Sequence, residues 1–173
     1  MEETSSPKSD PKVFEIPIKY YEEDMDTELA KGKKKEILEL FTKYNQIRTQ
    51  KEYDDISINL HRACQEGDVD LIRILLSEQI EYKSLVFKID KTNKTASLIK
   101  NTLTSNVLIV PRLITHEKND YLVTSICSFH ITNRSFSNIP KLKVKFEENS
   151  AVKTIYGNSF LYSDICEIYF PES

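Results

Sequence analysis

The stretch Lys-Leu-Lys-Val-Lys-Phe-Glu-Glu at residues 141–148 has a counterpart in Ile-Cys-Glu-Ile-Tyr-Phe-Pro-Glu at residues 165–172. In both stretches apolar residues alternate with polar or outward ones, which is typical of a β-strand with one buried face. The inward residues, and a phenylalanine before each stretch, recur 24 residues apart (166 − 142): Leu142 and Cys166, Val144 and Ile168, Phe146 and Phe170, Phe136 and Phe160. This constant interval predicts a short β-solenoid, in which the strand of one copy lies beside the strand of the next.

The segment before each of these strands is duplicated too. Val-Thr-Ser-Ile at 123–126 matches Val-Lys-Thr-Ile at 152–155 with an offset of 29 (152 − 123). The first copy therefore contains five more residues before Phe136 than the second contains before Phe160.

More strands are predicted upstream. Residues 85–90 and 95–99 flank a polar turn, which favours a β-hairpin. Residues 107–110 form an apolar strand that Pro111 ends. A polar loop at 115–120 then leads into the strand that contains the first Val-Thr-Ser-Ile copy.

The block from Phe87 to Ser173 resembles the BspA-like leucine-rich-repeat family, which includes surface antigens of protists and bacteria. A repeat of that family runs approximately Val-Thr-Ser-Ile-Gly-x-x-Ala-Phe, followed by a few polar residues and an alternating strand that ends in Pro-x-Ser. The resemblance is carried by Val110-Pro111, Val123–Ile126, Val152–Ile155, Ser159-Phe160 and Ile168–Ser173. The sequence departs from the pattern at Cys127 and Tyr156, which replace glycine, and at Ser159, which replaces alanine. The resemblance implies a leucine-rich-repeat solenoid.

Helical periodicity covers the region before the strands. Apolar residues at helical spacing predict one helix at 34–50, and its apolar face consists of Ile37, Leu40, Phe41, Tyr44 and Ile47. Within residues 59–78, a short helix is expected to end at Gly67 with a left-handed C-cap. Asp68 is then expected to cap a second helix, whose buried stripe is Leu71, Ile72, Leu75 and Leu76.

The second helical region resembles the helix pair of an ankyrin repeat, through Leu-His-Arg-Ala-Cys at residues 60–64 followed by Gly67. The usual Thr-Pro before Leu-His is replaced by Ile58-Asn59. The resemblance implies a local hydrogen bond for His61 and a structural role for the pair, which we expect to cover the first coil of the stack together with the 34–50 helix. Cys64 is expected in the core.

The predicted organisation is therefore α+β. Residues 1–33 read as a polar, disordered tail with a small apolar island at 13–18 that could dock on the folded part. Residues 34–83 form the ankyrin-like helical segment, and residues 84–173 form the leucine-rich-repeat solenoid. The chain stops directly after an alternating strand, so we expect either that the repeat array continues in a longer chain or that two copies meet end to end.

Motifs of catalysis and cofactor binding are missing from the sequence. Only 3 glycines are present, and there is no phosphate-binding loop, no Gly-x-Ser-x-Gly and no His-Glu-x-x-His. Cys127 and His130 are spaced for a metal, but they lack a second ligand pair. We therefore predict no enzymatic activity, no cofactor and no metal.

The charge of the chain and the start of its sequence give no functional signal either. The net charge of −3 gives no nucleic-acid footprint. The start lacks the apolar core of a secretory signal, no stretch is long enough to span a membrane, and the three cysteines do not form a disulfide framework. The default expectation is a cytoplasmic protein, with the cell surface as the alternative.

The expected function is protein–protein interaction without catalysis. In a stack of strands, outward side chains form a ladder about 4.8 Å apart that a partner can contact. On the two copies these candidate partner-binding positions are Lys143, Lys145, Glu167 and Tyr169. A surface adhesin or structural antigen is the alternative function, and the sequence does not identify the partner or the oligomeric state.

Overall fold

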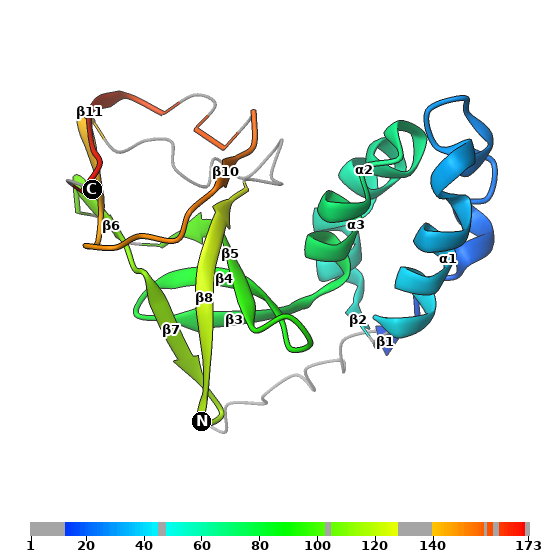
Figure 1. The fold of residues 1–173 in the computed structure, drawn as a ribbon, viewed down its shortest axis with the longest axis horizontal. Helices are drawn as coiled ribbons and strands as arrows, with labels where there is room; N and C mark the ends of the chain where they lie inside the picture. The colour runs from blue at the N-terminus through cyan, green and yellow to red at the C-terminus, as the bar shows by residue number, and fades with distance from the viewer. Residues whose placement is uncertain are drawn as a thin grey trace, which may run out of the picture.

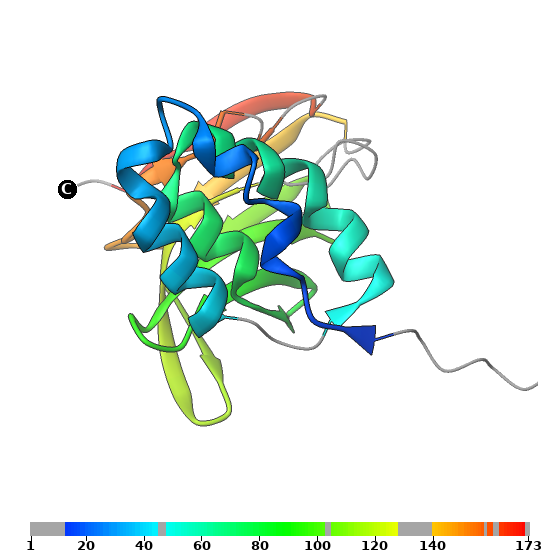
Figure 2. The same ribbon diagram turned by 90° about the vertical axis from the view of Figure 1, so that its right-hand side faces the viewer.

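The computed structural model describes residues 13–44, 48–102, 105–127, 140–157, 159–160 and 163–171. It is a mixed fold in which a layer of helices packs on one side of a six-stranded sheet, and a three-stranded parallel sheet packs on the other side (Figure 1). In Figure 2 the helices lie in front of the strands. Phe136, Ile47 and His130, which featured in sequence-based predictions, lie outside the described residues.

The helical layer contains three α-helices: α1 (Lys34–Lys43), α2 (Gln50–Glu66) and α3 (Val69–Leu76). Helix α1 is shorter than the predicted 34–50, and α2 is much longer than the predicted short helix. The reason lies at Thr49, where a capping box starts α2: the Thr49 hydroxyl accepts from Glu52 N, and the Glu52 carboxylate accepts from Thr49 N at 2.8 Å. A short antiparallel pair, β1 (Val13–Phe14) with β2 (Arg48–Thr49), precedes α2.

The turn between α2 and α3 has the predicted geometry. Gly67 ends α2 in the left-handed conformation with φ 66°, and Asp68 caps α3 by accepting a hydrogen bond from Leu71 N at 3.0 Å. Ile72, Leu75 and Leu76 are buried as expected, whereas Leu71 is only partly buried. The assignment of this helix pair to the ankyrin family stays a prediction.

The prediction of a disordered tail over residues 1–33 is wrong for its described part. Residues 13–33 contain three single-turn 3₁₀ segments: η1 (Ile18–Tyr20), η2 (Asp24–Asp26) and η3 (Lys31–Lys33). This segment is held because three of its apolar side chains, Ile16, Tyr21 and Met25, enter the helical core, and Ala30 is buried as well; all four are at most 2% exposed. The apolar island at 13–18, which the sequence suggested could dock on the folded part, does so at Ile16.

The six-stranded sheet mixes parallel and antiparallel pairs. Strands β3 (Glu78–Tyr82), β4 (Leu85–Asp90) and β5 (Thr95–Asn101) form an antiparallel meander, and β5, β8 (Asn119–Ile126) and β10 (Thr154–Ile155) pair in parallel. Strand β7 (Leu113–His116) forms a hairpin with β8. The sheet starts at Glu78, so the predicted boundary at residue 84 lies too late, and the predicted loop at 115–120 belongs largely to the β7–β8 hairpin.

The three-stranded sheet is parallel throughout, in the order β11 (Ile165–Tyr169), β9 (Leu142–Phe146), β6 (Val107–Val110). Its register confirms the 24-residue interval between β9 and β11, because Val144 pairs with Ile168 and Lys145 with Tyr169. A bulge between Ile165 and Glu167 shifts the register at the start of β11.

The described strands of the two parallel ladders alternate along the chain: β5 precedes β6, β8 precedes β9, and β10 precedes β11. Apolar side chains between the two sheets form one core, including Phe87, Leu98, Val123, Leu142 and Val144. The opposite face of the six-stranded sheet contacts the helices, with Val86, Ile99 and Cys127 in the helical core.

The helices were expected to shield the first coil. They lie instead across the face of the six-stranded sheet, and the outer edge of β5 is paired with β4.

Several turns place residues other than glycine in the left-handed region. Lys83 and Ser84 do so between β3 and β4, with φ 49° and 63°, and Glu117 and Lys118 do so between β7 and β8, with φ 49° and 65°. Hairpin turns of this handedness match the twist of the strands that they join.

Candidate functional site

The predicted partner-binding residues lie on one face, the outward face of the three-stranded sheet. The parallel register lines up two rows across β6, β9 and β11, each with one residue per strand. One row is Val107, Lys143 and Glu167; the other is Ile109, Lys145 and Tyr169. The structure thus brings the four predicted residues together and adds two apolar ones from β6.

Neighbouring side chains in these rows contact each other. Lys143 Nζ lies 3.0 Å from Glu167 Oε1, and this hydrogen bond raises the pKa of Lys143. Lys145 Nζ lies 5.2 Å from the centre of the Tyr169 ring, within the range of a cation–π contact. The ladder therefore presents one compensated charge and one cation held against an aromatic ring.

An apolar groove borders the rows at β6. It has a volume of about 330 Å³ and is lined by Val107, Ile109, Pro111, Leu113 and five residues around them. Ile109 is 53% exposed and Leu113 is 42% exposed, which is high for branched aliphatic side chains. Lys83 and Glu147 supply charges at its rim, so the face combines apolar surface with charged edges.

The inward side of the two copies differs in burial. Leu142, Val144 and Phe146 are buried, as the alternation predicts, but Ile168 and Phe170 are 43% and 67% exposed. Phe170 still stacks on Phe146, with ring centres 5.1 Å apart and planes at 11°. Strand β11 has β9 as its only neighbour among the described strands. Continuation of the array and end-to-end pairing of two copies stay predictions.

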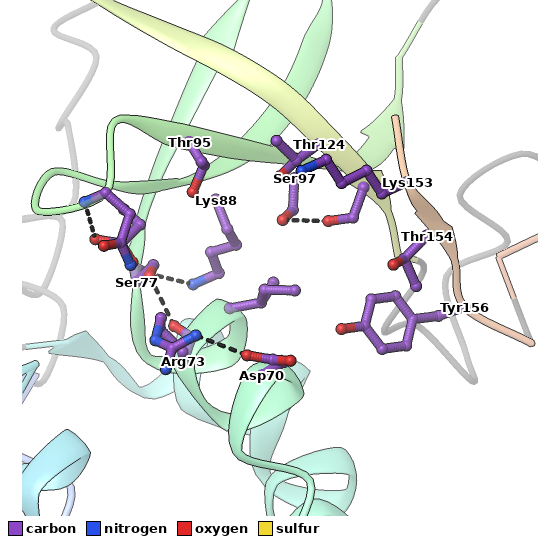
Figure 3. A pocket seen from close by; sticks show the side chains of 14 residues that line it. Asp70, Arg73, Ser77, Lys88, Thr95, Ser97, Thr124, Lys153, Thr154 and Tyr156 are labelled. Atoms are coloured by element: carbon purple, nitrogen blue, oxygen red, sulfur yellow. Dashed lines mark hydrogen bonds and ion pairs between the residues drawn. The ribbon is translucent and has the colours of Figure 1, made fainter. Parts of the chain in front are cut away.

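A second candidate site is a polar cavity of about 300 Å³ between α3 and the helix-facing side of the six-stranded sheet (Figure 3). Composition gave no signal for it, because its residues come from four separate strands and one helix. Alternation within β4 could have marked Lys88 and Asp90, which share a face with the apolar Val86.

His61, Cys64 and Cys127 were the residues considered for catalysis or metal binding, and each has contacts of a structural kind. His61 bonds through Nδ1 to Asp24, from a segment 37 residues earlier, so its hydrogen bond is not the local one that the ankyrin resemblance implied. Its ring also lies 4.3 Å from that of Tyr21. Cys64 is buried as predicted, and burial raises its pKa to about 12. Cys127 is buried as well, and the described residues contain no group of three or more metal-ligating side chains.

The departures from the repeat pattern have physical reasons in the structure. Ser159 is buried, and its hydroxyl donates to Ile126 O at 2.8 Å, which satisfies the polar group. Cys127 and Tyr156, which replace glycine, both pack against the helical core. Larger side chains at these positions fill the space between the sheet and the helices.

The chain is similar to three crystal structures of leucine-rich-repeat proteins. That from Bacteroides capillosus ATCC 29799 shares 22% identity with a TM-score of 0.41, and the match covers 52% of this chain and 63% of the other. A leucine rich cell surface protein from Faecalibacterium prausnitzii A2-165 shares 21% identity with a TM-score of 0.38, and the match covers 53% of this chain and 30% of the other. A leucine-rich repeat protein from Bacteroides ovatus ATCC 8483 shares 23% identity with a TM-score of 0.38, and the match covers 53% of this chain and 23% of the other.

This chain therefore spans less than two thirds of each of those structures. No protein-family model and no curated protein sequence matches it. Among the described residues, no helix has the length and apolar character needed to cross a membrane.

Proposed function

We propose that the chain is a short leucine-rich-repeat solenoid of the BspA-like type that acts as a non-enzymatic protein-interaction module. Its coils are the strand pairs β5–β6, β8–β9 and β10–β11, and the helices are a structural layer packed on one face. The observation that carries this proposal is the double parallel ladder: β8 pairs in parallel with β5 before it and β10 after it, and β9 pairs in parallel with β6 before it and β11 after it.

The binding face is the outward side of β6, β9 and β11. Its partner is a protein that inserts an apolar side chain into the groove beside Ile109 and places a carboxylate near Lys145. This chemistry follows from the face itself: Ile109 and Leu113 supply exposed apolar area, and Lys145 stands beside Ile109 in the same row, while Lys143 is already paired with Glu167. Interfaces usually combine such an apolar centre with a charged rim.

The compartment belongs to the same proposal. We assign the module to the cytoplasm, with the cell surface as the alternative, and labelling of intact cells with a membrane-impermeant amine reagent distinguishes the two.

Affinity purification with cross-linking and mass spectrometry tests the binding face. Ile109→Asp places a charge in the groove, and Ile58→Asp is a matched control because Ile58 is a 63% exposed isoleucine on α2. We expect a partner that the native chain and Ile58→Asp enrich equally, that Ile109→Asp loses, and that cross-links to Lys143 or Lys145. Retention of every partner by Ile109→Asp, or cross-links confined to the helices, would show that another surface binds.

A further inference from the structure

The cavity between α3 and the six-stranded sheet has two different walls. Helix α3 and the residue after it supply Asp70, Arg73 and Ser77, and the sheet supplies Lys88 and a set of hydroxyl groups (Figure 3). Lys88 is only 2% exposed, and Lys153 lies on the cavity lining with an exposed side chain. The cavity therefore has a buried cation inside and a second cation on a solvent-accessible part of its lining.

The carboxylates of the cavity are already engaged. Asp70 Oδ1 accepts from Arg73 at 2.7 Å. Asp90 accepts from Thr92 N, Asn93 N and the Asn93 side chain, at 2.7 to 3.1 Å, and so holds the β4–β5 turn. Each carboxylate thus has hydrogen-bond partners of its own, and among the described residues neither forms an ion pair with Lys88 or Lys153.

Lys88 carries more donors than the protein uses. Its ammonium group has three N–H donors, and within the part of the chain that the structure describes it makes one hydrogen bond, to Ser77 O at 3.1 Å. Arg48 lies behind it and donates to Leu76 O, so both cations face the carboxyl end of α3. Desolvation, followed by the charge of Arg48, lowers the pKa of Lys88 to about 7.

The hydroxyls form a row across three strands. Ser97 on β5 pairs in register with Ser125 on β8, and Ser125 pairs with Thr154 on β10. The Ser97 and Ser125 hydroxyls lie 2.6 Å apart, and this bond uses one of their two protons. At a strand spacing of about 4.8 Å the row extends over about 10 Å, which exceeds a single phosphate and suits a ligand with several hydroxyl groups.

We propose that this cavity binds a small polyhydroxylated anion of the sugar-phosphate class. The phosphate accepts hydrogen bonds from Lys88 and Lys153, and the sugar hydroxyls bond to Ser97, Ser125 and Thr154. A volume of about 300 Å³ accommodates one monosaccharide unit. This site faces the helices, whereas the proposed partner-binding face is on the other sheet, so the two proposals stand or fall separately.

Binding of such an anion is coupled to proton uptake by Lys88. The charged or titratable groups around it are Arg48 from β2, Glu52 and Asp55 from α2, Asp70 and Arg73 from α3, Asp90 on β4, and Lys153 and Tyr156 beside β10. A bound phosphate raises the pKa of Lys88, so above pH 7 the free protein must gain a proton to bind. A sugar phosphate is already a dianion there, since its second pKa is about 6.

Isothermal titration calorimetry with glucose 6-phosphate tests the proposal at low salt and pH 7. We expect binding that is at least about tenfold tighter than that of glucose or inorganic phosphate. Lys88→Met, which keeps an unbranched side chain one atom shorter and removes the ammonium group, should weaken it about tenfold or more, as loss of a charge-assisted hydrogen bond does. Ser125→Ala should weaken it less, and Lys35→Met, at an exposed position on α1, should leave it unchanged.

From pH 7 to pH 9 the affinity of the native chain should fall, by up to about tenfold per unit. Absence of binding at millimolar concentrations, or equal affinity for inorganic phosphate, overturns the proposal.

If Lys88→Met does not fold, amide chemical shifts of the native chain decide instead. Shifts on glucose 6-phosphate addition that centre on residues 88, 97, 125 and 154 support the site, and shifts elsewhere overturn it.

Discussion

Gly67 lies directly against the backbone of Leu29: a Cβ built on Gly67 would stand 2.8 Å from Leu29 O and 3.1 Å from the Cα of Ala30. The end of α2 and the segment before α1 therefore touch backbone to backbone, which only glycine permits. This contact, together with the Thr27 hydroxyl bonded to Gln65 O, fixes residues 27–30 to the helical layer.

Gly67→Ala should consequently be strongly destabilising. The left-handed φ costs an alanine about 1 kcal/mol, and the clash with Leu29 O adds to that, for a total of about 3 kcal/mol. A thermal melt should shift downward by about 10 °C. Gly32→Ala is the matched control, because a Cβ there meets nothing within 4 Å. Equal melting temperatures for both variants would show that the 27–30 segment does not pack on α2.

Phe160→Ala tests the second repeat copy. The side chain is only partly buried against the core between the sheets, so we expect a loss of about 2 kcal/mol, below the 3–5 kcal/mol typical of a fully buried phenylalanine. Chemical denaturation measures it. Phe170→Ala, at a 67% exposed position, should cost less. A Phe160 variant as stable as the native chain would contradict the register of the copies.

Thr49→Ala removes the hydroxyl that accepts from Glu52 N in the capping box at the start of α2, and leaves the backbone N–H of residue 49 to donate to the Glu52 carboxylate. The expected loss is about 1 kcal/mol, and urea unfolding detects it. Ser57→Ala, on the exposed part of the same helix, should be nearly neutral. If the two substitutions had the same effect, the start of α2 would have to be stabilised by other contacts.

Lys88 should make stability depend on pH. Its pKa is about 7 in the folded chain and about 10.4 when unfolded, so between these values the unfolded state binds more protons. The cost of burying the charge is thus fully present below pH 7, and stability rises as pH increases from 7 toward 10. Melting temperatures of the native chain and Lys88→Met, compared from pH 6 to pH 10, should differ by an amount that changes across this window, because only the native chain loses the cost of the buried charge. Parallel curves would contradict the shifted pKa.

The parallel strands were predictable because their signal is local and repeated. Alternation marked the buried residues of β9, and the constant interval gave its pairing with β11. The four outward residues followed from the same pattern. The groove beside them could not be predicted from this pattern, because Leu113 belongs to a strand whose polar neighbours resemble a loop.

The N-terminal segment and the polar cavity were beyond sequence reasoning for a common reason. Both depend on contacts between residues far apart in the chain. Tyr21 is buried by α1 and α2 although its neighbours are charged, and Ser97 meets Ser125 across 28 residues. Local composition describes neither contact.

The left-handed turns carry a further consequence. Lys83, Ser84, Glu117 and Lys118 occupy backbone conformations that cost a residue with a Cβ about 1 kcal/mol each. Asparagine followed by glycine is the preferred pair for such two-residue hairpins. The chain is therefore less stable than the same backbone would be with asparagine and glycine in these turns. Evolution or a protein engineer could raise its heat tolerance at the hairpin tips without altering the packed interior.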